Sequence, residues 1–128
     1  MTTRFAKALL AASLTLTAAA MAPTLNARAA TPRETCREAI KAAGALHGVC
    51  FWSEEGYQGT LKVHTDPKPP SVCGNIAAAQ SAVNLTTDTR KFFANSGCHD
   101  DNYLSELAPN GESDDLDPTS DVPAESWR

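Results

Sequence analysis

The sequence predicts an all-β sandwich of two Greek-key motifs, with a short N-terminal helix in front of it. Three observations lead to this fold: an aromatic hairpin pattern in residues 50–59, apolar alternation in residues 60–65, and a second hairpin pattern that begins at Arg90. Alternating strands bury every second side chain, and two such sheets can share one core. The chain is interpreted as a degenerate repeat of roughly forty residues, with four short strands in each unit.

The first 29 residues are predicted to be a secretory signal peptide. Arg4 and Lys7 are followed by the uncharged stretch Ala8–Ala22, and an A-x-A triplet ends at Ala29. Basic, apolar and small-residue regions in this order are typical of a leader that is removed on export. A membrane anchor is the alternative, but the uncharged run is too short to span a bilayer. We therefore expect a secreted, extracellular protein whose mature form has no membrane segment.

The charge of the remaining chain excludes two classes of partner. The leader holds three of the 11 Lys and Arg residues and none of the 15 Asp and Glu residues, so the remainder has a net charge of −7. Nucleic acids and anionic membranes bind basic surfaces, so neither is expected as a partner. The length allows one domain. We divide it into an N-terminal helical extension over residues 30–48 and a sandwich over 49–128, and expect a monomer.

The cysteines indicate disulfide bonds. An even number of cysteines in a small exported chain predicts two disulfides. A zinc site is the alternative, but no C-x-x-C or H-x-x-x-H spacing occurs and the three histidines are scattered, so neither a metal nor another cofactor is expected. The four cysteines are Cys36, Cys50, Cys73 and Cys98.

A helix is predicted from about Pro32 to Leu46. Thr31 is a typical cap, Pro32 suits the first helical position, and Glu34 suits the third. Apolar residues from Cys36 to Ala43 then recur on one face, and Gly44 or Gly48 can end the helix. Because this face is mostly Ala, we expect it to pack on the domain.

The central hairpin comprises an aromatic strand and a polar turn. Trp52 favours a strand, residues 54–56 form the turn, and Tyr57 resumes the aromatic pattern. Gly59 can adopt a positive φ, so the chain can fold back closely there.

The next segment alternates, with Leu61 and Val63 directed inward and His64 on an exposed face. Prolines then end the strand and form a rigid loop over residues 66–70. Residues 81–85 are interpreted as the closing strand of the first half. Within them, Asn84-Leu85-Thr86 matches a glycosylation sequon, which the sequence leaves uninterpreted.

The second half repeats the order of the first. Phe93 and Cys98 are spaced as Trp52 and Tyr57 are, and Asp100 stands where Gly59 stood. Strands are expected over residues 90–94 and 103–108, the latter ended by the turn 109–111. We expect the acidic run 114–121 to be a solvated loop. Trp127 is expected in the core.

These motifs resemble a known family. The stretches Val49–Glu54 with Tyr57-x-Gly59, Ser81–Asn84, Phe93–Cys98, and Leu107–Glu112 with Asp115-Leu116 are similar to the actinobacterial metalloproteinase inhibitors, peptidase inhibitor family 36. The resemblance covers residues 49–128 and implies a βγ-crystallin-like fold. It implies that Ser81 hydrogen-bonds the folded hairpin, and that the disulfides are Cys36–Cys50 and Cys73–Cys98. The chain departs from the family at Asp100, in its N-terminal helix, and in lacking a short cysteine-closed reactive loop.

The sequence predicts a non-enzyme. The histidines have no Ser or Cys partner once the cysteines are in disulfides, and the paired acids lie in turns. The resemblance implies a secreted inhibitor that binds an extracellular peptidase, and a metallopeptidase above all. A rigid loop can dock in a protease cleft with little ordering cost. The candidate inhibitory loop is Pro69, Pro70, Ser71, Val72 and Cys73; alternatively, its prolines only stiffen a turn.

Two other functions are kept as alternatives. One is a calcium-binding crystallin module, although calcium binding is predicted to be absent or weak. The corresponding stretches, residues 77–82 and 121–126, lack the paired Asn or Asp ligands that such a site requires. The other is an extracellular structural or killer-toxin-like protein of crystallin fold.

Overall fold

The computed structural model describes residues 28–65 and 67–128, so nearly all of the predicted leader lies outside the described residues. These residues form one α-helix, eight strands and two 3-10 turns, and the prediction of a mostly β protein with an N-terminal helix is confirmed. None of their helices has the length and apolar character needed to cross a bilayer. The elements are α1 (Pro32–Ala42), β1 (Gly48–Glu54), η1 (Glu55–Tyr57), β2 (Gln58–His64), β3 (Gly74–Ala79), β4 (Ser81–Leu85), β5 (Arg90–Phe93), η2 (Asp100–Asn102), β6 (Tyr103–Leu107), β7 (Glu112–Ser113) and β8 (Ala124–Trp127).

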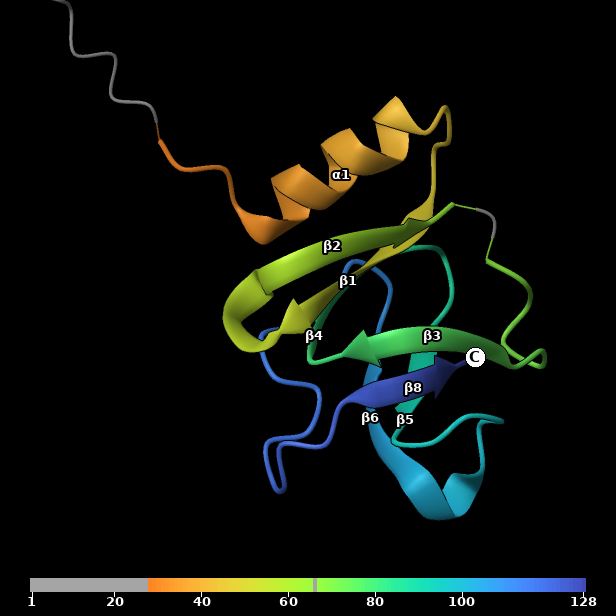
Figure 1. Cartoon of the computed structure of the whole chain (residues 1–128). Helices are drawn as coiled ribbons and strands as arrows, with labels where there is room; N and C mark the ends of the chain where they lie inside the picture. The colour runs from red at the N-terminus through yellow and green to blue at the C-terminus, as the bar shows by residue number, and fades with distance from the viewer. Residues whose placement is uncertain (1–27, 66) are drawn as a thin grey trace, which may run out of the picture.

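The strands form two antiparallel four-stranded sheets. The first has the order β2-β1-β4-β7 and the second the order β3-β8-β5-β6. Each half of the chain therefore contributes three strands to one sheet and its third strand, β3 or β7, to the other sheet. Figure 1 shows the two sheets facing each other, with α1 over the outer side of the first.

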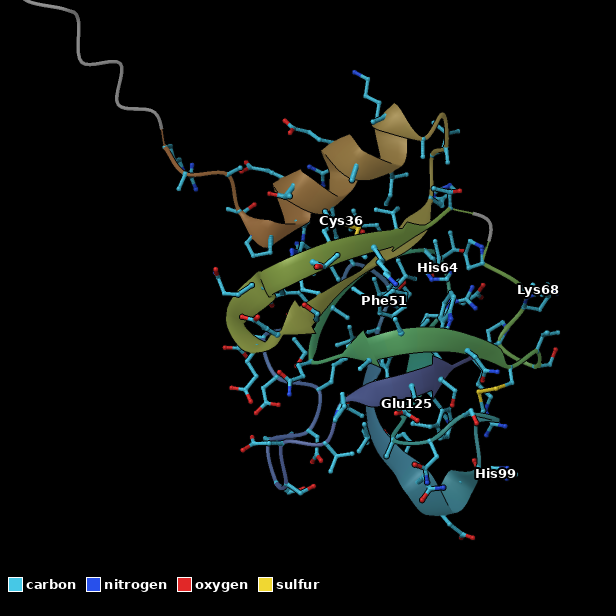
Figure 2. All side chains as sticks on the ribbon, in the orientation of Figure 1. Cys36, Phe51, His64, Lys68, His99 and Glu125 are labelled. Carbon is cyan, nitrogen blue, oxygen red and sulfur yellow. A yellow bond between two sulfur atoms is a disulfide. The ribbon has the colours of Figure 1, made fainter. Side chains whose placement is uncertain are left out.

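The first sheet is covered on both faces. Between the sheets lies a core that includes Val49, Phe51, Phe92 and Trp127. On the other face, α1 covers a second apolar cluster. Its buried members are Cys36, Ile40, Cys50, Trp52, Val83 and Leu85. Strands β1 and β4 are buried over most of their length for this reason. Figure 2 shows Cys36 beneath the helix and Phe51 on the side facing the second sheet.

The helix begins as predicted and ends earlier. Thr31 and Glu34 form a reciprocal capping box at its start. At its end, Gly44 has a φ of 77°, its N–H donates to the carbonyl of Lys41, and the Ala45 N–H donates to that of Ile40. This pair of bonds is a Schellman motif, which stops a helix at a residue in the left-handed region. The predicted extension to Leu46 is therefore wrong.

The shorter helix allows the first disulfide to close. The implied pairing Cys36–Cys50 is confirmed, with 5.7 Å between the two Cα atoms. A helix continuing to Leu46 would carry the chain about 15 Å from Cys36, and only four residues would remain for the return. Ending the helix at Ala42 removes this conflict.

The prediction for the two sides of β2 is wrong in one respect. Leu61 and Val63 do face apolar neighbours, but these belong to the cluster under α1. His64, predicted on an exposed face, is half-buried, with its ring 5.3 Å from that of Phe51 and 5.6 Å from that of Trp127. His64 lies on the same face of β2 as the exposed Lys62, but the rings of Phe51 and Trp127 cover this end of the strand, so the alternation fails only at His64.

Candidate functional site at the loop end of the sandwich

The candidate loop, residues 67–73, connects the first sheet to the second. It lies between β2 and β3, on the right of Figure 1. The side chains of Pro69, Pro70, Ser71, Val72 and Cys73 are exposed, as a loop that meets another protein requires. Its backbone is folded by a turn in which the Val72 N–H donates to the carbonyl of Pro69 at 2.8 Å.

A buried arginine holds the first part of this loop. Arg90 begins β5 with only 2% of its surface exposed, and its Nη1 donates to the carbonyl oxygen of Lys68 at 2.6 Å. The same guanidinium donates through Nε to Thr86, lies 3.5 Å from the carboxylate of Asp88, and stacks over the ring of Trp127. A guanidinium offers five donors in a fixed plane, so one side chain ties the loop to the 86–90 turn and to the core. Sequence analysis placed Arg90 only at the start of a strand and missed this function.

The second part of the loop is held covalently. Cys73 is bonded to Cys98, as the resemblance implied, and the two Cα atoms are 5.8 Å apart. Beyond Cys73 the chain enters β3, where Asn75 accepts a hydrogen bond from the Gly97 N–H at 3.2 Å. Cys73 and its neighbours are therefore attached to the turn that follows β5. The loop is anchored at Lys68 and at Cys73, and the residues between these anchors are exposed.

A cavity of about 220 Å³ lies beneath the loop. Gly74 leaves it open, because a Cβ at this position would lie 3.0 Å from Nε1 of Trp127. The charged side chains on its wall are all basic, whereas the chain as a whole is acidic. Its lining is formed by His64, Thr65, Pro67, Lys68, Val72, Cys73, Gly74, Asn75, Arg90, Trp127 and Arg128.

Among the titratable residues that line this cavity, His64 has the ordinary pKa closest to neutral pH. Burial lowers the pKa of His64 below its ordinary value, and the positive charge of Lys62 lowers it further. The aromatic rings of Phe51 and Trp127 on either side offer a protonated imidazole no carboxylate partner. His64 is therefore neutral at neutral pH and packs as an aromatic residue.

Two other loops meet the candidate loop at the same end of the molecule. A shallow depression of about 530 Å³ is bordered by residues 43–47, by Thr65 and Pro67, and by the 86–90 turn. Loops on one end of a rigid sandwich are common locations for binding surfaces. We call residues 43–47, 65, 67–73 and 86–90 the loop end.

The hairpin motif lies at the other end of β1 and β2, away from the loop end. Trp52 and Tyr57 form an edge-to-face pair with 5.3 Å between ring centroids, and burial is the main reason that the pKa of Tyr57 is raised to about 12. Ser81 accepts a hydrogen bond from the Tyr57 N–H at 3.0 Å and donates to the carbonyl of Glu54 at 2.7 Å, as the resemblance implied. Gly59 has a φ of 77°, and a Cβ there would lie 2.2 Å from the Ser53 hydroxyl oxygen.

Sequence analysis missed the serine that does the same in the second half. Ser126 accepts from the Cys98 N–H at 3.0 Å and donates to the carbonyl of Asn95. Phe93 is buried, 6.1 Å from the ring of Tyr103. Ser126 lies in β8 and is fully buried, and no strand was predicted over these residues.

The acidic run is only partly the solvated loop that was expected. Asp117 is 5% exposed and accepts hydrogen bonds from Thr119, Ser120 and the Val122 N–H. The hydroxyls of Ser120 and Thr119, in that order, are the main reason that its pKa falls to about 2. Asp117 therefore organises the loop from within, which a run of like charges does not reveal. The prediction of a solvated loop is wrong at Asp117, whereas Asp114 and Asp121 are exposed as expected.

Three other carboxylates of this region come together. Oxygen atoms of Glu55, Asp115 and Asp121 all lie within 4.8 Å of one another. The charge of Asp115, followed by that of Asp121, raises the pKa of Glu55 above its ordinary value. Asp115 and Asp121 were both predicted in the acidic run, but the approach of Glu55, from the distant hairpin turn, was not predicted. The prediction that calcium binds weakly or not at all remains a prediction.

The sequon residue Asn84 is inaccessible. It is 0% exposed, and its Nδ2 donates to the carbonyls of Asp88, Leu107 and Ala108 at distances from 2.8 to 3.1 Å. Its Oδ1 accepts from the backbone and the hydroxyl of Thr86. This amide therefore supports the 86–90 turn of the loop end.

The chain matches no protein-family model, and no curated protein is significantly similar to it.

Proposed function

We propose that the protein binds an extracellular peptidase, with a metallopeptidase as the target class, and that it carries out no chemistry of its own. The loop 67–73 enters the cleft of the peptidase. One observation carries this proposal: the loop is anchored by Arg90 at the Lys68 carbonyl and by the Cys73–Cys98 disulfide, while the side chains from Pro69 to Cys73 are exposed. An inhibitory loop needs this combination, because a loop without fixed ends is cleaved and released, and because little ordering cost then opposes binding.

The proposed fold is the crystallin-like pair of Greek keys. Support comes from the exchange of β3 and β7 between the two sheets, and from Ser81 and Ser126, which bridge equivalent hairpins. The target class comes from the resemblance of residues 49–128 to the metalloproteinase inhibitors. Two disulfides suit a protein that works in an oxidising medium rich in peptidases.

The test replaces Pro69 and Pro70 with Gly in the mature chain. Inhibition of a thermolysin-like metallopeptidase and of serine peptidases is measured with a chromogenic substrate. We expect a several-fold larger inhibition constant for the double variant, because Gly frees the unbound loop. No core contact is removed, so the loss of unfolding free energy should be limited to roughly 1–2 kcal/mol, which comes from the greater freedom of the unfolded chain. Pro118→Gly is the matched control, since Pro118 is an exposed proline of the β7–β8 loop, on the opposite side of Figure 1.

The outcome decides between this function and its alternatives. If the purified protein at micromolar concentration inhibits none of these peptidases, the structural or toxin-like role replaces the proposal. If it inhibits one of them but the Pro69 and Pro70 variant is as strong as the wild type, another part of the protein makes the contact.

A further inference from the structure

We infer that Leu46 is a second anchor on the same binding surface and enters an apolar specificity pocket of the peptidase. This inference rests on the proposed function and names a residue outside the loop 67–73. Leu46 is 90% exposed, whereas the other large exposed hydrophobic residues of the described chain, Tyr103, Val72 and Val122, lie between 38% and 46%. A leucine that is almost fully exposed leaves its whole apolar surface for a partner.

The backbone on both sides of Leu46 is fixed. On the N-terminal side, the Schellman bonds to Ile40 and Lys41 hold Gly44 and Ala45 against the helix. On the C-terminal side, Gly48 pairs with Leu85 of β4 and packs so closely that a Cβ would lie 2.7 Å from the carbonyl oxygen of His64. Leu46 and His47 are therefore the central part of a short connection between two fixed ends.

A disulfide closes this segment. Cys36 lies in α1 and Cys50 in β1, so their bond joins the two elements that the connection links. Sequence analysis found no short cysteine-closed reactive loop because it counted residues between cysteines. In the structure, the helix uses most of those residues, and only residues 43–47 lie outside α1 and β1. A fixed loop loses little conformational entropy on binding.

The position of Leu46 connects it to the proposed site. It borders the depression that Pro67 and the 86–90 turn also border. It also borders a second depression on its other side, formed with Arg37, Lys41, Leu85 and Asn110. Leu46 therefore stands on a ridge between two hollows, a convex shape that is complementary to the concave cleft of an enzyme. Figure 1 shows the segment after α1 at the same side of the molecule as the loop between β2 and β3.

The experiment compares Leu46→Ala and Leu46→Arg with the wild-type mature chain, and Val122→Ala is the matched control for loss of an exposed apolar side chain. Inhibition constants are measured against a thermolysin-like, a chymotrypsin-like and a trypsin-like peptidase. We expect Leu46→Ala to weaken inhibition of the wild-type target at least about tenfold, because apolar pockets discriminate by about 10–200-fold for each methylene. Leu46→Arg should gain at least about tenfold against the trypsin-like enzyme, whose pocket accepts a basic side chain. Melting temperatures should not change, since Leu46 is 90% exposed and belongs to neither core cluster.

Each result bears on a different statement. If the wild type inhibits a peptidase, the Pro69 and Pro70 variant is weaker, and Leu46→Ala stays within twofold of the wild type, the proposed function stands and the anchor is refuted. If the wild type inhibits none of the enzymes, both fall together. Light scattering provides a further readout: a wild-type dimer that Leu46→Ala converts to monomer would assign Leu46 to self-association and overturn the inference.

Discussion

The turns of the two hairpins share a backbone feature and are held by different chemistry. In each, a glycine with positive φ, Gly56 or Gly97, precedes a non-glycine residue that also has positive φ, Tyr57 at 61° or Cys98 at 52°. In each, a buried serine hydroxyl joins the two ends of the turn. The first hairpin is fixed by the Trp52–Tyr57 ring pair, the second by the disulfide of Cys98.

This difference indicates how the repeat was adapted to the loop end. A ring pair stabilises only the hairpin in which both rings lie. The disulfide of the second hairpin reaches a residue outside it, Cys73, and so transfers the rigidity of the hairpin to the candidate loop. The tips differ as well: Arg128 forms an ion pair with Asp100 near the second, whereas Glu55 on the first faces other carboxylates. Only the turn of the second hairpin is thus joined covalently to the candidate loop.

The largest change in stability is expected when the Cys73–Cys98 disulfide and the Trp52–Tyr57 ring pair are removed in separate variants. A Cys73→Ala and Cys98→Ala double variant should lose about 3 kcal/mol of unfolding free energy, because a disulfide over this separation restricts the unfolded chain. Tyr57→Leu keeps an apolar side chain and removes only the ring contact, so about 0.5–1.5 kcal/mol should be lost. Denaturant titration measures both. Equal losses would contradict the distinction between the two hairpins.

Removing the serine hydroxyl that bridges each turn should reduce stability by a similar amount in both halves. Ser81→Ala leaves the partly buried Tyr57 N–H and the Glu54 carbonyl without their hydroxyl partner, and Ser126→Ala does the same to the buried Cys98 N–H and the Asn95 carbonyl. An unsatisfied buried group costs about 1–3 kcal/mol. Ser53→Ala is the control, since its hydroxyl also accepts a backbone N–H, from Thr60, but at an exposed position where water can replace it. The repeat interpretation predicts similar losses for Ser81 and Ser126. A neutral Ser126→Ala would show that only the first hairpin depends on its bridge.

The smallest effects are expected from changes in pH. They distinguish Glu55, at the tip of the first hairpin, from Asp117, in the β7–β8 loop. The pKa of Asp117 is lowered to about 2, so its contribution to stability is present above its ordinary value of 3.8 and is lost as pH falls through 2. The pKa of Glu55 is raised, so the sign reverses: its protonated form is favoured by folding, and this contribution is lost as pH rises through the folded pKa. At pH 7, Asp117→Asn should lower the melting temperature and Glu55→Gln should raise it. Near pH 2 both differences should shrink, and a constant difference for Asp117→Asn across this range would refute the charge-dependent explanation.

Local patterns predicted the strands and hairpins because each depends on neighbouring residues. The positions of β4, β5 and β6 agree with the expectations to within one residue at the strand ends. The hydrogen bond of Ser81 to the hairpin was implied by the family resemblance and not by a local pattern. The errors concern layers and distant contacts. Alternation in β2 could not indicate that Phe51 and Trp127 of the inter-sheet core pack against His64, so His64 was placed on an exposed face. Arg90 was missed as an anchor because its partner at Lys68 is 22 residues away.

The burial of Asn84 has a practical consequence for producing the protein. Its side-chain nitrogen makes three hydrogen bonds in the folded chain, and a glycan attached there would replace a donated hydrogen and place a bulky sugar at a fully buried position. A eukaryotic host that glycosylates chains as they enter the secretory pathway would meet the Asn84-Leu85-Thr86 sequon before β4 has paired. Every chain modified at that moment is diverted from the native fold. A bacterial periplasm would form the disulfides without adding the sugar. Removing the sequon by Thr86→Val would have a structural cost, because the Thr86 hydroxyl also accepts a hydrogen bond from Arg90 beneath the candidate loop.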